Sequence, residues 1–277
     1  MFIEIFICLI AIAFSVLITY FAIPVGHGYH YFAPILLLIA GYIVGVILAW
    51  CILYLLSLPY GKNKDREKPS KLASFLLRES ISYINNHARI KTKIVNKQPL
   101  PRERFMLIAN HRSKFDPMIL AQKYGGYDLA FISKPTNFKI PIGHRFMYGA
   151  CYLPIDRYDK LKSLEVIRKA TTLIENNYSS IGVFPEGTRS ETCELGPFHE
   201  GVFSIAMKSK APIVVTSFDG TEKIHKNFPL KSTKVTLNII RIIYPEEYQD
   251  MTPKAVSDMC YELIKSSLPD VNLTPTN

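Results

Sequence analysis

The sequence predicts an α/β fold, in which a layered domain with a largely parallel sheet flanked by helices follows an N-terminal hairpin of two apolar helices. Two observations support this prediction. The first 60 residues contain no Lys, Arg or Asp. In the rest of the chain, short apolar runs alternate with segments of helical periodicity, which is typical of a parallel sheet covered by helices. We therefore divide the chain into a membrane hairpin of residues 1–60, a basic linker of residues 61–74 and a body of residues 75–277.

Two apolar windows in the hairpin, residues 2–23 and 34–58, are long enough to cross a bilayer. As helices they would reach roughly 33 and 37 Å, against a hydrocarbon core of about 30 Å. A cleaved signal peptide is disfavoured, because the first window lacks a basic start and a small-residue cleavage site, and a second window follows at once. Window length favours spanning over an arrangement in which both helices sit in one leaflet.

The residues around the windows predict which way the hairpin faces. The connector, residues 24–33, has no Lys or Arg and carries aromatic side chains suited to a membrane interface, namely Tyr29, Tyr31 and Phe32. The segment after the second window is basic, with Lys62, Lys64, Arg66, Lys68 and Lys71. By the positive-inside rule, the body lies on the cytoplasmic face. We expect an integral membrane protein of the bacterial cell membrane, or of the endoplasmic reticulum membrane in a eukaryote.

The body is strongly basic. The 33 Lys and Arg against 23 Asp and Glu give the chain a net charge of +10, and Glu4 is the one charged side chain of these types in the hairpin. A basic body tethered to a bilayer meets anionic lipid or an anionic substrate, so nucleic acid is a disfavoured partner. The five cysteines are scattered without disulfide or zinc spacing, which agrees with a reducing compartment. No bound metal or cofactor is expected.

The apolar pattern of the body predicts alternating strands and helices. Strands are expected near residues 89–95, 105–109, 129–133, 151–155, 181–184, 213–217 and 235–243, and helices near residues 70–87, 116–123, 145–148, 161–176, 201–208 and 253–267. Ser70 and Asp116 have the residue type of helix N-caps, and Pro117 follows Asp116. In the helix near residues 161–176, Leu164, Ile167, Leu173 and Ile174 are expected to face inward. In a parallel sheet, reactive loops gather at the carboxyl ends of the strands.

The first unusual loop is the stretch of residues 110–116, in which His111 and Asp116 stand five positions apart after an apolar run. An imidazole is the side chain best suited to take a proton from a hydroxyl near neutral pH, and a carboxylate on its other nitrogen would fix its tautomer. The pair therefore predicts a reaction at an alcohol. The alternative is structural: Asp116 only caps a helix, and His111 only satisfies a nearby carbonyl.

The second unusual loop is the stretch of residues 184–190, which reads F-P-E-G-T-R-S. Gly187 in a tight turn lets backbone N–H groups approach an anion. Arg189 offers a planar fork that matches phosphate oxygens, and Thr188 adds a hydroxyl donor. This turn predicts a site for a phosphate monoester. The alternative is an ordinary turn with a surface ion pair between Glu186 and Arg189.

Two further cations follow predicted strands. Arg157 comes after the strand near residues 151–155 and stands next to Asp156. It is either a second phosphate ligand or one half of a surface ion pair. Lys134 follows the strand near residues 129–133, and a lone lysine in such a place is often only solvated. Both cations are candidate phosphate ligands.

Together these loops resemble the glycerolipid acyltransferase family, specifically its 1-acyl-sn-glycerol-3-phosphate acyltransferases. Residues 110–116 match the family's N-H-x-x-x-x-D box, and residues 184–190 match its F-P-E-G-T-R-S box at every position. Residues 149–157 resemble its G-x-x-x-hydrophobic-x-R box, with Gly149 and Arg157 two positions farther apart than in that pattern, and residues 211–215 resemble its apolar box with an inner proline. The resemblance covers about residues 75–245. One departure is the basic stretch of residues 112–114, which bears on the preference for headgroup or acyl donor.

The resemblance implies an enzyme of phospholipid biosynthesis that acylates the sn-2 hydroxyl of lysophosphatidic acid to give phosphatidic acid. His111 would act as general base and Asp116 would orient it. The acyl thioester is acyl-CoA or acyl carrier protein, and no other cofactor is implied. The remaining roles concern the acceptor: phosphate ligands at Lys134, Arg157 and Arg189, and a glycerol pocket shaped by Glu186, Gly187 and Thr188.

Three rival functions remain. The nearest is an acyltransferase for glycerol 3-phosphate or for another lysophospholipid. A hydrolase with Ser113 as nucleophile is disfavoured, because no G-x-S-x-G elbow occurs in the chain. The third is a non-catalytic membrane module that binds anionic lipids, for which His111→Ala would retain function.

Overall fold

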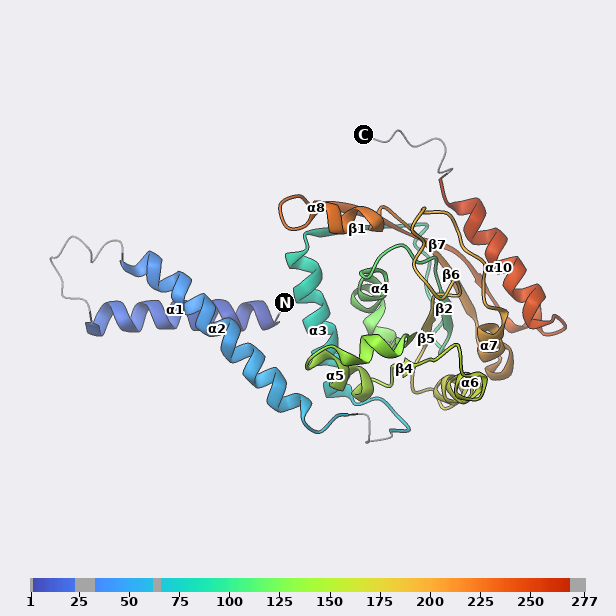
Figure 1. The fold of residues 1–277 in the computed structure, drawn as a ribbon, viewed down its shortest axis with the longest axis horizontal. Helices are drawn as coiled ribbons and strands as arrows, with labels where there is room; N and C mark the ends of the chain where they lie inside the picture. Colours follow the sequence, from blue (N-terminus) through green and yellow to red (C-terminus); the bar gives the residue numbers. More distant parts are fainter. Residues whose placement is uncertain (1, 23–32, 62–65, 270–277) are drawn as a thin grey trace. The chain divides into compact units, whose positions relative to one another are not determined.

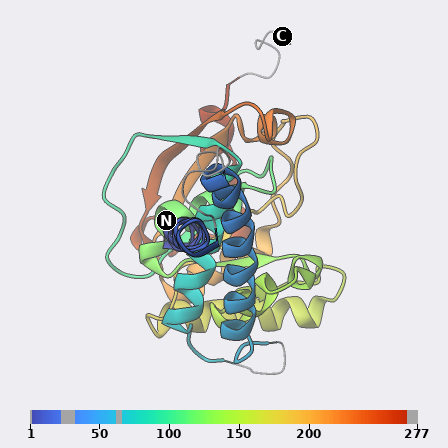
Figure 2. The same cartoon turned by 90° about the vertical axis from the view of Figure 1, so that its left-hand side faces the viewer.

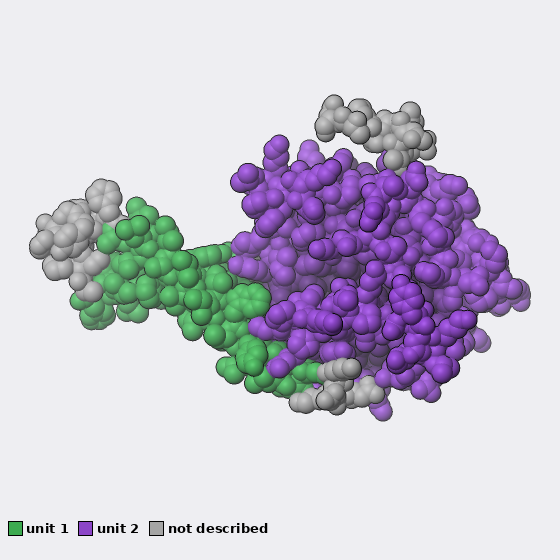
Figure 3. All heavy atoms as spheres, in the orientation of Figure 1, with its two compact units in different colours: residues 1–61 green, residues 62–277 purple. Residues whose placement is uncertain are grey.

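The computed structural model describes residues 2–22, 33–61 and 66–269. The expectations for the aromatic connector, and for Lys62 and Lys64, lie outside these described residues. The chain divides into two compact units, Met1–Gly61 and Lys62–Asn277, which are coloured separately in Figure 3.

The first unit consists of helices α1 (Phe2–Ala22) and α2 (Ala33–Ser57), which cross each other in Figure 1 and lie side by side in Figure 2, where α1 is viewed end-on. Both are long and apolar enough to cross a membrane, by length and composition. At the crossing, a Cβ at Gly41 would lie 2.9 Å from the backbone of Ala11. Small residues of this kind allow two helix backbones to approach closely, which explains the glycine at this position.

The second unit contains a seven-stranded sheet, and its order is β1-β7-β6-β2-β5-β3-β4. Strands β6, β2, β5, β3 and β4 run parallel to one another, while β7 and β1 run in the opposite direction. The predicted α/β class with a largely parallel sheet is therefore confirmed. The strands are β1 (Ile90–Val95), β2 (Met106–Ile108), β3 (Ala130–Ser133), β4 (Leu153–Pro154), β5 (Ile181–Val183), β6 (Ile213–Asp219) and β7 (Thr233–Ile243).

Helices cover both faces of this sheet. Figure 1 shows α3 and α4 on one side and α7 and α10 on the other. The α-helices of the unit are α3 (Lys71–His87), α4 (Asp116–Tyr124), α5 (Gly143–Gly149), α6 (Lys160–Glu175), α7 (Ser204–Ser209), α8 (Ile224–Asn227), α9 (Pro245–Tyr248) and α10 (Pro253–Ser267). Short 3-10 turns lie at η2 (Gly125–Tyr127), η3 (Pro135–Lys139), η4 (Glu200–Phe203) and η5 (Thr221–Lys223). The central strands β2 and β6 are fully buried along most of their length, so the core lies between these two helix layers.

Helix ends and faces differ in part from the sequence prediction. Ser70 caps α3 as expected, because its hydroxyl accepts a hydrogen bond from the N–H of Ala73 at 3.3 Å. Asp116 does not cap α4: it is the first helical residue after the N-cap Phe115, and its carboxylate turns back into the preceding loop. In α6, Ile167, Leu173 and Ile174 are buried as predicted. The prediction that Leu164 faces inward is wrong, since this side chain is 60% exposed and the buried residues of α6 begin only at Val166.

The direction of the strands decides where the functional residues gather. The five parallel strands end at the same edge of the sheet, and the loops that follow β2, β5, β3 and β4 carry His111, Glu186, Lys134 and Arg157 respectively. Reactive groups collect at such an edge because the chain leaves every parallel strand there.

Candidate active site

The imidazole of His111 is held by the carboxylate of Asp116. Nδ1 of His111 lies 2.8 Å from Oδ2 of Asp116, and the Asp116 side chain is fully buried. An ionised carboxylate only accepts hydrogen bonds, so Nδ1 carries the proton and Nε2 is left with a free lone pair. The His111 side chain is 18% exposed, so this nitrogen stays within reach of a bound molecule. The pair can remove a proton from an alcohol.

The Asp116 carboxylate is fixed by the loop that it faces. Besides His111, its Oδ2 accepts the backbone N–H groups of Arg112 and Ser113, each at 2.7 Å. Oδ1 is buried and has no hydrogen-bond partner among the described residues. Three donors on one oxygen hold the carboxylate in a single orientation, which in turn fixes the tautomer and the direction of the imidazole.

An aromatic ring packs against the face of the imidazole. The rings of His111 and Phe184 are stacked with their centroids 4.4 Å apart, and Phe184 stacks in turn on Phe131 at 6.1 Å. Phe184 is the first residue of the F-P-E-G-T-R-S stretch, and sequence reasoning gave it no role. Its place directly after a buried strand, at the head of the motif, is the signal that would have found it.

The carboxylate of Glu186 joins two loops of the site. Its Oε1 accepts the backbone N–H of His111 at 2.6 Å, and its Oε2 accepts that of Gly196 at 2.9 Å. Burial raises the pKa of the Glu186 carboxyl above its ordinary value, and the two N–H groups counter part of this rise. Both oxygens are thus engaged by the protein. These contacts make the glutamate a support for the His111 loop, whereas the sequence had suggested that it shapes the glycerol pocket.

The two sequence neighbours of His111 hold its loop against the end of β6 and against the loop that contains Cys193. The Asn110 side chain both donates to the carbonyl of Phe218 (3.1 Å) and accepts from its N–H (2.7 Å). The Arg112 guanidinium is buried, donates to Asp219 at 3.2 Å and donates to the carbonyl of Cys193 at 2.8 Å. The charge of Arg112 therefore meets the protein's own carboxylate and does not face a headgroup. Ser113, the nucleophile of the rival hydrolase, is buried.

The candidate phosphate ligands lie at the same edge but are held differently. The Arg157 guanidinium lies against Gly187, where a Cβ would collide with it, and Gly187 has the left-handed φ of +67°. The left-handed φ is the reason that glycine is favoured there. The side chains of Lys134, Thr188 and Arg189 are exposed. Within residues 66–269, no ion pair joins Glu186 to Arg189, which leaves that arginine available to a ligand.

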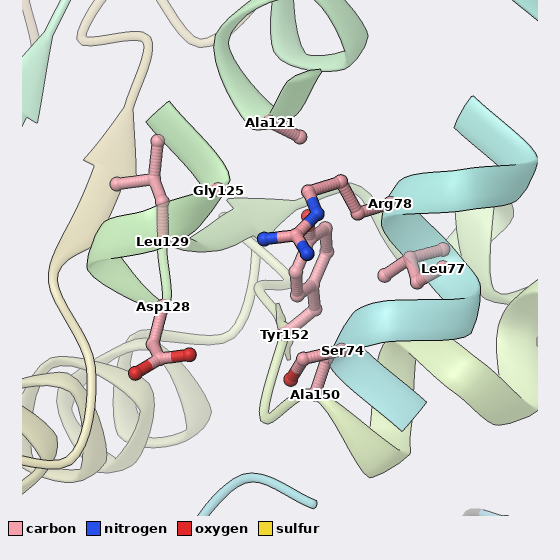
Figure 4. A pocket seen from close by; sticks show the side chains of 9 residues that line it. All are labelled: Ser74, Leu77, Arg78, Ala121, Gly125, Asp128, Leu129, Ala150 and Tyr152. Atoms are coloured by element: carbon pink, nitrogen blue, oxygen red, sulfur yellow. The ribbon is translucent and has the colours of Figure 1, made fainter. Parts of the chain in front are cut away.

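The cavity in Figure 4 belongs to a different part of the fold. It lies near the amino ends of β3 and β4, opposite the edge that carries His111. Its lining comes from Ser74, Leu77, Arg78, Ala121, Gly125, Asp128, Leu129, Ala150 and Tyr152. Across the described residues, no group of three or more His, Cys, Asp and Glu side chains could hold a metal ion. At the edge of the sheet that carries His111, the groups that could contact a bound molecule are the imidazole and the cations around it.

Solved structures support the fold. A 1-acyl-sn-glycerophosphate (LPA) acyltransferase from Thermotoga maritima superposes with a TM-score of 0.62 at 19% identity, over 83% of this chain and 91% of that one. A likeness at this identity concerns the arrangement of strands and helices.

Sequence relatives point to one class of protein. A 1-acyl-sn-glycerol-3-phosphate acyltransferase of Chlamydomonas reinhardtii is 29% identical over 65% of this chain and 53% of its own length. A chloroplastic protein of the same name from Brassica napus is 34% identical over 48% and 39%, and one from Saccharomyces cerevisiae is 26% identical over 65% and 59%. The alignments thus span about two fifths to three fifths of these relatives' own lengths.

A family model described as Acyltransferase matches residues 91–218. This stretch begins in β1, ends in β6 and contains His111, Asp116, Lys134, Arg157 and the turn at Glu186 to Arg189. The resemblance stated from the motifs is confirmed by this match and by the named relatives. Residues 91–218 of this chain are therefore similar to the acyltransferase family.

Proposed function

We propose that this protein transfers a fatty acyl group from an acyl thioester to the sn-2 hydroxyl of 1-acylglycerol 3-phosphate. One observation carries the proposal: His111 donates its Nδ1–H to a buried carboxylate and so keeps Nε2 free, at the sheet edge where Arg157 lies against the Gly187 turn. A base for a hydroxyl and cations for a phosphate then stand on neighbouring loops. The names of the sequence relatives agree with this substrate.

The reaction follows from the protonation state of His111. Nε2 removes the proton of the sn-2 hydroxyl while the oxygen attacks the thioester carbonyl. The tetrahedral intermediate collapses and expels the thiolate, and the imidazolium returns its proton to the sulfur. Asp116 stabilises the imidazolium between these two steps. A covalent acyl-enzyme is unnecessary, because holding both substrates together already removes much of the entropic barrier.

The acceptor is bound through its phosphate. Arg157 and Arg189 provide planar donors, and Lys134 adds a third positive charge at the end of β3. Gly187 and Thr188 form the turn between them. The only co-substrate is the thioester, acyl-CoA or acyl carrier protein, and no further cofactor takes part.

The hairpin of α1 and α2 anchors the enzyme where its lipid substrate resides. Two helices of sufficient length and apolar character support membrane association. The basic residues that follow α2 in the sequence favour a body on the cytoplasmic side.

The test is a transfer assay with purified full-length protein in detergent. Lysophosphatidic acid and glycerol 3-phosphate are each offered with acyl-CoA and with acyl carrier protein. We expect phosphatidic acid from lysophosphatidic acid with at least one donor, and loss of this product in His111→Ala. If only glycerol 3-phosphate were acylated, it would take the place of lysophosphatidic acid as the proposed acceptor. If neither donor gave any transfer, the proposal would be contradicted. Function retained by His111→Ala would favour the non-catalytic lipid-binding module.

A further inference from the structure

The start of α6 presents large apolar side chains to solvent. Tyr158, Leu161 and Leu164 have exposed fractions of 101%, 80% and 60%. We call these three residues the α6 apolar face. Single exposed apolar residues are common on soluble proteins, but here three large ones occur within seven residues, Tyr158 just before α6 and Leu161 and Leu164 in its first turns.

This exposure is confined to the start of α6. The buried residues of the helix begin at Val166 and Ile167 and continue through Ala170, so Leu161 and Leu164 lie before the part of the helix that packs against the body. Leu161 and Leu164 are neighbours on the surface because residues three apart lie one above the other on a helix. The α6 apolar face is therefore exposed because the first turns of the helix have no neighbouring element of residues 66–269 packed over them.

The charges around the face are mainly positive. Asp159 is paired with Lys162 at 2.8 Å and Glu165 with Lys169 at 3.7 Å, while the third nearby carboxylate, Asp156, accepts the N–H of Tyr158 at 3.1 Å. The other two cations on the exposed side, Lys160 and Arg168, have no ion pair within residues 66–269. An apolar face with such a border is complementary to an anionic lipid surface, in which long basic side chains reach the headgroups.

The face adjoins the candidate active site. Tyr158 follows Arg157 directly, and α6 starts at the carboxyl end of β4, the edge at which His111 also lies. A surface that touches the bilayer here would bring the reacting groups to the level of the lipid headgroups.

We propose that the α6 apolar face docks onto an anionic bilayer, with Tyr158, Leu161 and Leu164 entering the interface and Lys160 and Arg168 meeting lipid phosphates. Tyrosine is favoured at this depth because its ring is apolar and its hydroxyl is wet. This inference rests on the proposed function in one respect: it specifies how the site reaches a substrate that resides in the membrane.

The first experiment measures insertion without using activity. Tyr158→Trp is made in the full-length Trp50→Phe protein, which removes the chain's single tryptophan, so that all tryptophan emission comes from position 158. The protein is reconstituted in vesicles of phosphatidylglycerol and phosphatidylcholine, with and without brominated lipid. We expect the emission of the introduced indole to shift to the blue and to lose at least half of its intensity to bromine. Tyr244→Trp is the matched control, because Tyr244 is also exposed but follows β7 at the opposite edge of the sheet, and its replacement should remain unquenched.

The second experiment links docking to the reaction. We expect the double variant Leu161→Glu and Leu164→Glu to raise the KM for lysophosphatidic acid in vesicles at least tenfold, and to keep its rate in detergent micelles within twofold. The micelle rate also reports that the variant is folded.

Each alternative has a distinct result. An unquenched indole in an active Tyr158→Trp protein overturns docking and leaves the proposed function intact. A quenched indole in a protein without any acyl transfer supports docking and overturns the proposed function. A loss confined to reactions with acyl carrier protein would overturn docking and assign the face to that protein. If the protein in detergent were a dimer in the wild type and a monomer in the double variant, with half the protein mass, docking on a bilayer would be overturned. The α6 apolar face would then be the contact with a second copy of the chain.

Discussion

The two halves of the candidate site are built in different ways. The base half, His111 with Asp116 and Glu186, is largely buried, and hydrogen bonds within the protein hold His111 Nδ1, one oxygen of Asp116 and both oxygens of Glu186. The cation half, with Lys134 and Arg189 at its exposed end, has no ion pair within residues 66–269. Under the proposed function, the proton acceptor is thus assembled before any substrate arrives, and the phosphate would order the exposed cations when it binds.

This difference has a physical reason. Proton transfer depends on the direction and protonation state of one nitrogen, and a small displacement lowers the rate strongly. Phosphate binding depends on charge and tolerates several arrangements of long side chains. Damage to the base half should therefore lower kcat, and damage to the cation half should raise KM.

Asp116→Asn is expected to have the largest effect. The amide cannot stabilise the imidazolium as the carboxylate does, so kcat should fall by about 10²–10⁴-fold, the usual contribution of a general base. The KM for lysophosphatidic acid should remain close to that of wild type. Steady-state transfer in detergent measures both quantities.

The control is Asp128→Asn, which breaks the surface ion pair with Arg104 away from the site. It should leave kcat unchanged. A similar loss in both variants would mean that the effect of Asp116 is general destabilisation.

Arg189→Ala should show the opposite pattern. Losing one charge-assisted phosphate contact costs about 1.5–3 kcal/mol, which corresponds to a rise of about 10–150-fold in KM with kcat nearly constant. Arg241→Ala serves as control, because Arg241 pairs with Glu247 near the other end of the sheet. An unchanged KM in Arg189→Ala would remove this residue from the phosphate site.

Glu186→Gln should act mainly on stability. Replacing the carboxylate by an amide leaves one of the two buried N–H groups, of His111 or Gly196, facing a donor, at a cost of about 1–3 kcal/mol. Chemical denaturation of the full-length protein in detergent measures the shift. If the variant were as stable as wild type and its KM for lysophosphatidic acid were increased, Glu186 would contribute to the glycerol pocket, as the sequence predicts.

The pH dependence of this variant sharpens the test. Because burial raises the pKa of Glu186 in the folded state, its protonated form is favoured by folding. The contribution of Glu186 protonation to the free energy of unfolding is complete below the unfolded-state pKa of about 4.3. It is lost as the pH rises through the folded-state pKa. The stability of wild type relative to Glu186→Gln should therefore decrease over this pH range.

The strands and most helices could be predicted from the sequence, but some side chains were misplaced for identifiable reasons. The strands were found because β2 and β5 are short apolar runs between polar turns. Leu164 fits the apolar period of α6 but lies before the turn at which that helix begins to be buried. Local pattern does not report where a neighbouring element ends.

The candidate site shows the same limit. His111 and Asp116 stand close in sequence, so a motif could pair them. Glu186 contacts the His111 loop across 75 positions and Arg112 reaches Asp219 across 107, and such contacts depend on the order of strands in the sheet. From the sequence, Glu186 was therefore taken for a substrate ligand and Arg112 for a determinant of headgroup or donor preference.

The central claim is that the base is assembled before substrate binds, and the tautomer of His111 tests it most directly. Nitrogen-15 NMR of the substrate-free, histidine-labelled protein, with the signal of His111 identified by its absence in His111→Ala, reports which ring nitrogen carries the proton in the neutral ring. We expect a protonated Nδ1 and an unprotonated Nε2. A neutral ring protonated at Nε2, or an equal mixture of the two tautomers, would contradict the account.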